Sequence, residues 1–228
     1  MNRIQSFQPT KIDLLLSIIA AIIMPFICSI LYDLVGALIP LLIYYGFFCF
    51  GIVYVRKKTL NYSLPDKLFT NGFLFLFAFE IFRIFLSIFI YEPMETFNLP
   101  GFLLTLFIWA PINAFSEQLI WIYVYESFAN FYQAKSSKRK TFKVIGFILY
   151  LTIIALIHIL FWTKFLFESE SQFPWTIILI SGNFILSFGY LYLYLKSKSM
   201  VPVFIIHLIV DSSAVILSLY SIIPYLFI

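Results

Sequence analysis

The sequence predicts an all-α membrane protein, a polytopic helical bundle of about seven transmembrane helices. The chain of 228 residues is 62% hydrophobic and only 11% charged, whereas an average soluble domain is roughly half apolar and about a quarter charged. Its mean hydropathy is +0.99. The apolar residues fall in seven long runs, each sufficient for a helix that crosses a hydrocarbon core of about 30 Å.

Helices are expected for these runs because lipid offers no partner for unpaired backbone groups. In chain order the runs are Leu14–Tyr32, Leu34–Val55, Phe69–Tyr91, Gly101–Ser127, Phe142–Thr163, Trp175–Leu195 and Val201–Ile228. Only Asp33 marks the junction of the first two runs. The fourth run is overlong, so we expect it either to bend at Pro111 or to continue as an interfacial helix toward Tyr132. No repeat or second domain interrupts the pattern, and residues 1–228 are expected to form one domain.

Basic residues predict the orientation, because Lys and Arg gather in cytoplasmic loops. With the N-terminus inside and the C-terminus outside, the inside segments hold 13 of the 15 basic residues. These are Arg3, Lys11, Arg56, Lys57, Lys58, Lys67, Lys135, Lys138, Arg139, Lys140, Lys143, Lys196 and Lys198. The outside segments collect Asp33, Glu92, Glu95, Glu168 and Glu170. Short basic clusters between apolar runs also argue against nucleic acid as a partner, despite a net charge of +4.

Three tyrosines of the sixth run, Tyr190, Tyr192 and Tyr194, lie near its inner boundary. Tyr and Trp are enriched where a membrane meets water. We therefore expect these three residues to belong to an interfacial aromatic belt rather than to a ligand site.

Several charged residues lie inside the apolar runs, where each costs at least about 2.5–3.5 kcal/mol on insertion scales. Glu80 and Arg83 are three residues apart on the third helix, so they share a face and can pair. We favour a structural ion pair. The alternatives are a supporting role in catalysis, or an interaction of Arg83 with a carboxylate on a neighbouring helix.

The fourth helix carries Glu117, the fifth His158, and the seventh both His207 and Asp211. His207 and Asp211 are four residues apart and therefore lie on one helix face. Burying the four groups separately would be costly, so we expect them to converge on one wet pocket. His158 lies roughly 24 Å along its helix and His207 only about 9 Å. Convergence therefore requires that the fifth helix begin in the cytoplasm, tilt, or line a deep cavity.

Such a pocket suits the hydrolysis of an amide bond. A partly dehydrated carboxylate is an effective general base toward water, and a neutral imidazole can stabilise the oxyanion formed when water attacks a carbonyl. A zinc site with Glu117, His158 and His207 as ligands is an alternative, although the H-E-x-x-H spacing is absent. A proton or ion relay in a small transporter is another alternative.

The pattern resembles the CPBP family of intramembrane endopeptidases, which includes CAAX prenyl proteases and bacteriocin-processing (Abi) proteins. The family pattern runs E-E-x-x-x-R, then F-x-x-x-H, then H-x-x-x-N or H-x-x-x-D. Here Glu117 follows an Ala-Pro, His158 stands alone on the next helix, and H-L-I-V-D ends the stretch M-V-P-V-F-I-I-H-L-I-V-D. The resemblance covers about Trp109–Ser212, within a CPBP-like core of about residues 101–228.

The resemblance implies that Glu117 activates water, with His158, His207 and Asp211 as oxyanion-stabilising and orienting groups. It implies an integral protein of a membrane such as the bacterial cell membrane, with its active site open toward the cytoplasm. The implied partners are membrane lipid and a membrane-associated, prenylated or leader peptide as substrate, and no cofactor is expected.

Three positions depart from the family pattern. Gln118, Ile122 and Ile154 stand where the family has Glu, Arg and Phe. Gln118 keeps its hydrogen-bonding capacity, and the loss of an acidic and a basic residue together is consistent with one ion pair lost as a unit. We therefore predict a peptidase with reduced or altered activity. The alternative, favoured by this altered first motif, is a non-catalytic bacteriocin self-immunity or binding protein of the same fold.

Overall fold

The computed structural model describes residues 7–91, 93–95, 97–133, 136–166 and 175–227. Within these residues the chain is all α-helical and forms seven helical rods. The first three are α1 (Lys11–Ile18), η1 (Ile19–Ile23) and α2 (Met24–Val35); α3 (Leu38–Leu41), η2 (Leu42–Ile52) and α4 (Val53–Lys57); and α5 (Asn71–Ser87). The other four are α6 (Leu99–Leu104), η3 (Thr105–Trp109) and α7 (Ala110–Ala129); α8 (Lys138–Ile157), η4 (His158–Trp162) and α9 (Thr163–Leu166); α10 (Trp175–Ser197); and α11 (Val201–Ser218). The segments η1 to η4 are π-helical, and η6 (Ile223–Tyr225) is a 3-10 turn.

Five rods among the described residues are long and apolar enough to cross a membrane by length and composition. They are Lys11–Val35, Leu38–Lys57, Leu99–Ala129, Lys138–Leu166 and Val201–Ser218. These five rods indicate an integral membrane protein and confirm the predicted all-α class. Of the charged residues used to predict orientation, Arg3, Glu92, Lys135, Glu168 and Glu170 lie outside the described residues.

Two predicted boundaries are wrong. The first two rods are separated at Gly36, not at Asp33, because Gly36 has a φ of +80° and ends α2. The last helix ends at Ser218 rather than at Ile228. Leu219 has a left-handed φ of 54°, and the following turn is held where the backbone N–H of Ile222 donates to Thr105 Oγ1 at 2.9 Å. An uninterrupted apolar composition does not reveal either turn.

The overlong fourth run is one continuous helical rod from Leu99 to Ala129. It neither breaks at Pro111 nor ends before Ala129. Pro111 has no N–H for the preceding turn, and the rod adopts the wider π-helical form over Thr105–Trp109, directly before this proline. The widened turn lets the helix pass through Pro111.

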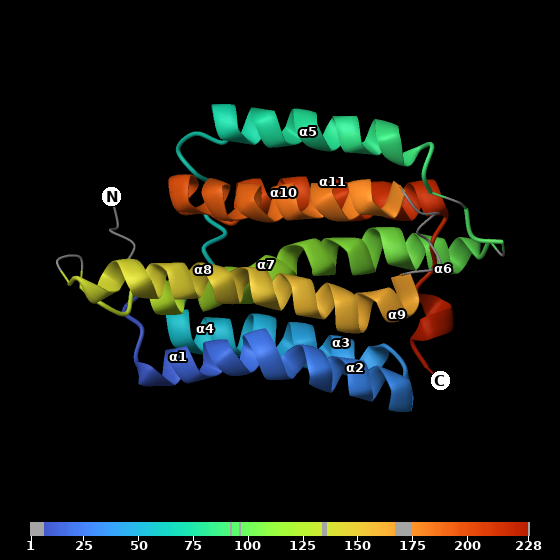
Figure 1. Cartoon of the computed structure of the whole chain (residues 1–228). Helices are drawn as coiled ribbons and strands as arrows, with labels where there is room; N and C mark the ends of the chain where they lie inside the picture. Colours follow the sequence, from blue (N-terminus) through green and yellow to red (C-terminus); the bar gives the residue numbers. More distant parts are fainter. Residues whose placement is uncertain (1–6, 92, 96, 134–135, 167–174, 228) are drawn as a thin grey trace.

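The helix α7 lies at the centre of the bundle. In Figure 1, α5 lies above α10 and α11, which lie above α7 and α8, while α1 to α4 form the lowest layer. α7 packs against α8, α11, η2 and α1, and 17 of its 20 residues are buried. Because neighbours cover most of its surface, buried polar side chains on α7 must find partners on other helices.

Gly36 allows a close approach that no other residue permits. A Cβ added there would lie 2.7 Å from the carbonyl oxygen of Leu226. Gly36→Ala is therefore expected to lower the free energy of unfolding by about 1–3 kcal/mol. Gly46→Ala is the matched control, because a Cβ there meets nothing within 4 Å. Thermal unfolding in detergent measures both variants, and equal midpoints would contradict the expected strain.

Candidate functional site

Side chains from α7 and α11 meet in the interior of the bundle. Nε2 of His207 lies 3.7 Å from Oε2 of Glu117 and 3.6 Å from Oδ1 of Asp211. Glu117 is 1% exposed and His207 is 5% exposed. The structure therefore brings together three of the four groups that the sequence analysis selected.

A chain of hydrogen bonds orients the imidazole of His207. Its Nδ1 lies 3.1 Å from Oε1 of Gln118. Nε2 of Gln118 donates to the hydroxyl of Tyr62 at 2.8 Å, and this hydroxyl donates to the backbone carbonyl of Phe115. In this arrangement Nδ1 is the donor, which assigns the proton of a neutral imidazole to Nδ1 and turns Nε2 toward the two carboxylates.

Two aromatic rings, from residues far apart in the sequence, stack on the imidazole of His207. Trp121 on α7 stacks at 5.6 Å between ring centroids, and Tyr190 on α10 stacks at 5.4 Å. Tyr190 is 4% exposed and Tyr194 is 2% exposed, whereas Tyr192 is 48% exposed. The predicted aromatic belt is thus wrong for Tyr190 and Tyr194, because their side chains face the bundle interior.

The two carboxylates have additional donors. Nε1 of Trp162 donates to Oε1 of Glu117 at 3.0 Å. Nδ2 of Asn113 donates to Oδ2 of Asp211 at 2.9 Å, and the hydroxyl of Tyr45 donates to Oδ1 of Asn113 at 2.6 Å. Each carboxylate therefore has one oxygen held by the protein and another turned toward Nε2 of His207.

The sequence analysis missed these supporting residues, although their spacing offered a signal. Asn113 precedes Glu117 by four residues and so lies on the same face of α7. Trp162 follows His158 by four residues on the fifth rod. A search for polar side chains one turn from each selected residue would have found both.

The three central groups must share at least one proton. Two carboxylates within 4 Å of one imidazole are unstable if both are charged and the imidazole is neutral, because burial removes the stabilising water. Glu117, His207 and Asp211 therefore form a unit positioned to exchange a proton. Such a unit can accept a proton from one reacting atom and return it to another.

The closest polar contact described for His158 is with its own helix rather than with the carboxylates. Its Nδ1 lies 2.7 Å from the carbonyl oxygen of Ile154 on its own helix. Its ring lies 6.2 Å from that of Trp121, the same residue that stacks on His207. The fifth rod begins at Lys138, four residues before the predicted start. Both histidine rings lie beside Trp121.

Glu80 and Arg83 form the predicted pair, with Nη1 of Arg83 2.9 Å from Oε2 of Glu80. Both residues are buried. The pair faces α10, where a Cβ on Gly182 would lie 2.7 Å from Nε of Arg83. It also interacts electrostatically with Tyr190, the residue stacked on His207. Glu80 also interacts electrostatically with Asp211, so the pair lies near the site.

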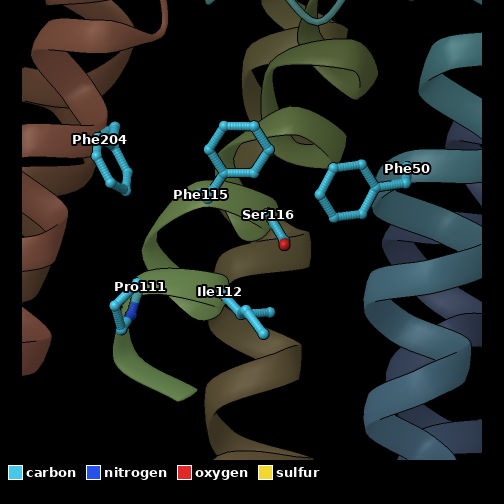
Figure 2. A pocket seen from close by; sticks show the side chains of 6 residues that line it. All are labelled: Phe50, Pro111, Ile112, Phe115, Ser116 and Phe204. Carbon is cyan, nitrogen blue, oxygen red and sulfur yellow. The ribbon is translucent and has the colours of Figure 1, made fainter. Parts of the chain in front are cut away.

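An apolar groove lies beside the site on the surface of α7. Its volume is about 490 Å³, and its walls are Phe50, Pro111, Ile112, Phe115, Ser116 and Phe204. Figure 2 shows four of these side chains on α7, with Phe50 from η2 on one side and Phe204 from α11 on the other. The ring of Tyr62 stacks on Phe115 at 4.0 Å, so Tyr62 lies between this groove and Gln118. The groove is not lined by Glu117, His207 or Asp211.

Within the described part of the chain, no three His, Cys, Asp or Glu side chains lie close enough together to hold a metal ion. The zinc alternative would require Glu117, His158 and His207 to form such a group. Comparisons with protein-family models, curated proteins and solved structures found no match.

Proposed function

We propose that this protein is an intramembrane endopeptidase of the CPBP type that hydrolyses a peptide bond with water activated by a glutamate. The observation that carries this proposal is the convergence of Glu117, His207 and Asp211 within 3.7 Å. In this proposal all seven rods span the membrane, with the N-terminus inside and the C-terminus outside. The substrate is a membrane-associated, prenylated or leader peptide, and the site opens toward the cytoplasm.

The proposed reaction uses each central group in turn. Glu117 accepts a proton from water while the water oxygen attacks the scissile carbonyl carbon. The resulting oxyanion is stabilised by hydrogen-bond donation from Nε2 of His207 when that nitrogen carries a proton, while Gln118 holds Nδ1 and Trp121 stacks on the ring. The proton then passes to the leaving amine as the C–N bond breaks. His158 would join the oxyanion site after a rotation about its own side chain.

The groove beside Tyr62 supports a membrane-embedded substrate. It is apolar, open and next to Ser116, whose hydroxyl oxygen is buried without a hydrogen-bond partner among the described residues. Movement of Tyr62 away from Phe115 would connect the groove to the Gln118 side of the site. An extended peptide in the groove would then place its backbone near Glu117.

A second candidate, a non-catalytic binding protein such as a bacteriocin self-immunity protein, is favoured by a different observation. Glu117 is almost fully buried and already accepts a hydrogen bond from Trp162. In addition, Ile122, which stands where the family pattern has Arg, is buried among apolar side chains. A buried carboxylate that already accepts a hydrogen bond suits a structural role in a binding protein as well as a role in catalysis.

The source of oxygen in the product distinguishes the two functions. The purified full-length protein in lipid nanodiscs is incubated with prenylated and leader peptides in ¹⁸O-labelled water, and the products are analysed by mass spectrometry. A peptidase yields two fragments, with one ¹⁸O atom in the new carboxyl group. Intact peptides that remain bound would overturn the peptidase proposal in favour of binding. Metal analysis of the same preparation, and cleavage in the presence of a chelator, test the zinc alternative.

A further inference from the structure

A polar pocket lies where α7 ends and α8 begins. Its volume is about 440 Å³. Its walls include four cationic side chains, Arg139, Lys140, Lys143 and Lys198, together with Asn130 and Ser136. The cations come from the first turns of α8 and from Lys198, the residue that follows α10. The helix α7 contributes uncharged residues and Glu126 to the same pocket.

Within the described part of the chain, the positive charge of this pocket is not neutralised by acidic side chains. Its one carboxylate, Glu126, pairs with Lys57 at 2.6 Å and accepts a hydrogen bond from Tyr194 at 2.7 Å. Among the described residues none of the four cations named above forms an ion pair. A pocket with four unpaired cations attracts a multivalent anion.

The backbone orients two sides of the pocket. Lys198 has a left-handed φ of 56° directly after α10, and its Nζ lies 6.0 Å from the ring centroid of Tyr194. On the opposite side the 20-residue helix α8 begins at Lys138, so its first backbone N–H groups lie at the same end as the pocket. The N–H of Arg139 already donates to the carbonyl oxygen of Ser136 at 3.1 Å, and the positive end of the helix dipole favours phosphate oxygens.

The surface beyond the pocket is apolar. On α8, Val144 is 52% exposed and Ile148 is 55% exposed, directly after Lys143. On α10, Phe188 is 47% exposed, and its ring lies 5.5 Å from that of Phe147 on α8. A molecule with a phosphate in the pocket could therefore lay hydrocarbon chains along these helices. Basic pockets between membrane helices near the cytoplasmic surface recognise anionic lipid headgroups in this way.

We propose that this pocket binds the phosphate of an anionic phospholipid, with its acyl chains on the exposed apolar side chains of α8 and α10. The inference goes beyond peptide hydrolysis and is independent of the chemistry at Glu117. A phosphate group can also come from a soluble molecule, and a carboxylate from an acidic peptide. Competition for the pocket distinguishes a phospholipid from a soluble phosphate and from an acidic peptide.

The test uses two double variants with the same change in charge. Lys140→Gln with Lys198→Gln removes two pocket cations, whereas Lys138→Gln with Lys196→Gln removes two cations that lie two residues away and outside the pocket. All four lysines are exposed, so all variants should fold. Native mass spectrometry of the full-length protein, released from detergent, measures retention of phosphatidylglycerol and phosphatidylcholine.

We expect the wild type to bind phosphatidylglycerol at least about tenfold more tightly than phosphatidylcholine. The pocket variant should lose at least about tenfold in affinity for phosphatidylglycerol, and the control variant should stay within about twofold of wild type. Equal losses in both variants would show general attraction to the surface and overturn the proposal. So would a wild type without preference between the two lipids.

Two competition arms distinguish the sources of the anion. Millimolar inorganic phosphate or glycerol phosphate should not displace phosphatidylglycerol, because neither can use the apolar surface of α8. Displacement by either would assign the pocket to a soluble phosphate and overturn the lipid proposal. Displacement by an acidic peptide with a free C-terminal carboxylate, at equal concentration, would assign the pocket to a peptide partner and also overturn it.

Discussion

Glu117→Gln is expected to abolish peptide cleavage while the fold stays intact. An amide cannot take a proton from water at neutral pH, so kcat should fall by about 10²–10⁴-fold. Gln has nearly the same volume, and its Oε1 can still accept the hydrogen bond that Trp162 donates at 3.0 Å. Its Nε2 would replace the oxygen that now lies 3.7 Å from Nε2 of His207, where an N–H can donate. The free energy of unfolding should therefore stay within about 1 kcal/mol of wild type.

The matched control applies the same carboxylate-to-amide change outside the site. Asp13→Asn is expected to lose stability and to keep the wild-type kcat in the folded fraction, because Asp13 contacts α4 and α7 away from His207. Cleavage of a peptide that the wild type hydrolyses and thermal unfolding in detergent are measured side by side. If Glu117→Gln kept more than about a tenth of the wild-type kcat, Glu117 would not be the general base.

The apolar runs predicted the helices because burial in lipid depends on composition and length, which a sequence shows directly. The residues at which the helices end could not be predicted from the sequence as well. Gly36 ends α2 because its backbone lies against Leu226, a contact between residues far apart in the chain. Leu219 turns in a left-handed conformation although leucine gives no such signal. Both ends depend on tertiary packing, which a local pattern does not contain.

At the site, the sequence could predict groups that share a helix face but not the rotation of one helix against another. His207 and Asp211 lie close together because they are four residues apart on α11. Glu117 meets them because an enclosed helix must satisfy its polar groups on other helices. His158 interacts electrostatically with His207, while its Nδ1 lies against the carbonyl oxygen of Ile154 on its own helix. Trp162, one turn further along, donates to Glu117.

Asp13→Ala is expected to cause the largest loss of stability. Asp13 is fully buried at the start of α1 and accepts five hydrogen bonds from three residues. Arg56 on α4 donates through Nε at 2.8 Å and Nη2 at 2.9 Å, and the hydroxyl of Tyr123 on α7 donates at 2.7 Å. The backbone N–H and hydroxyl of Thr10 complete the set at 2.7 Å each. One carboxylate therefore connects three helices.

Without this carboxylate, Arg56 and the buried hydroxyl of Tyr123 lose their shared partner, which should lower the free energy of unfolding by about 3–5 kcal/mol. Asp33→Ala is the matched control, because Asp33 pairs with Lys164 but its side chain is 61% exposed. Solvent screens such a pair, so the control should lose less than about 1 kcal/mol. Denaturant titration in detergent measures both variants. Equal losses would mean that Asp13, despite its burial and its five hydrogen bonds, contributes no more than a surface ion pair.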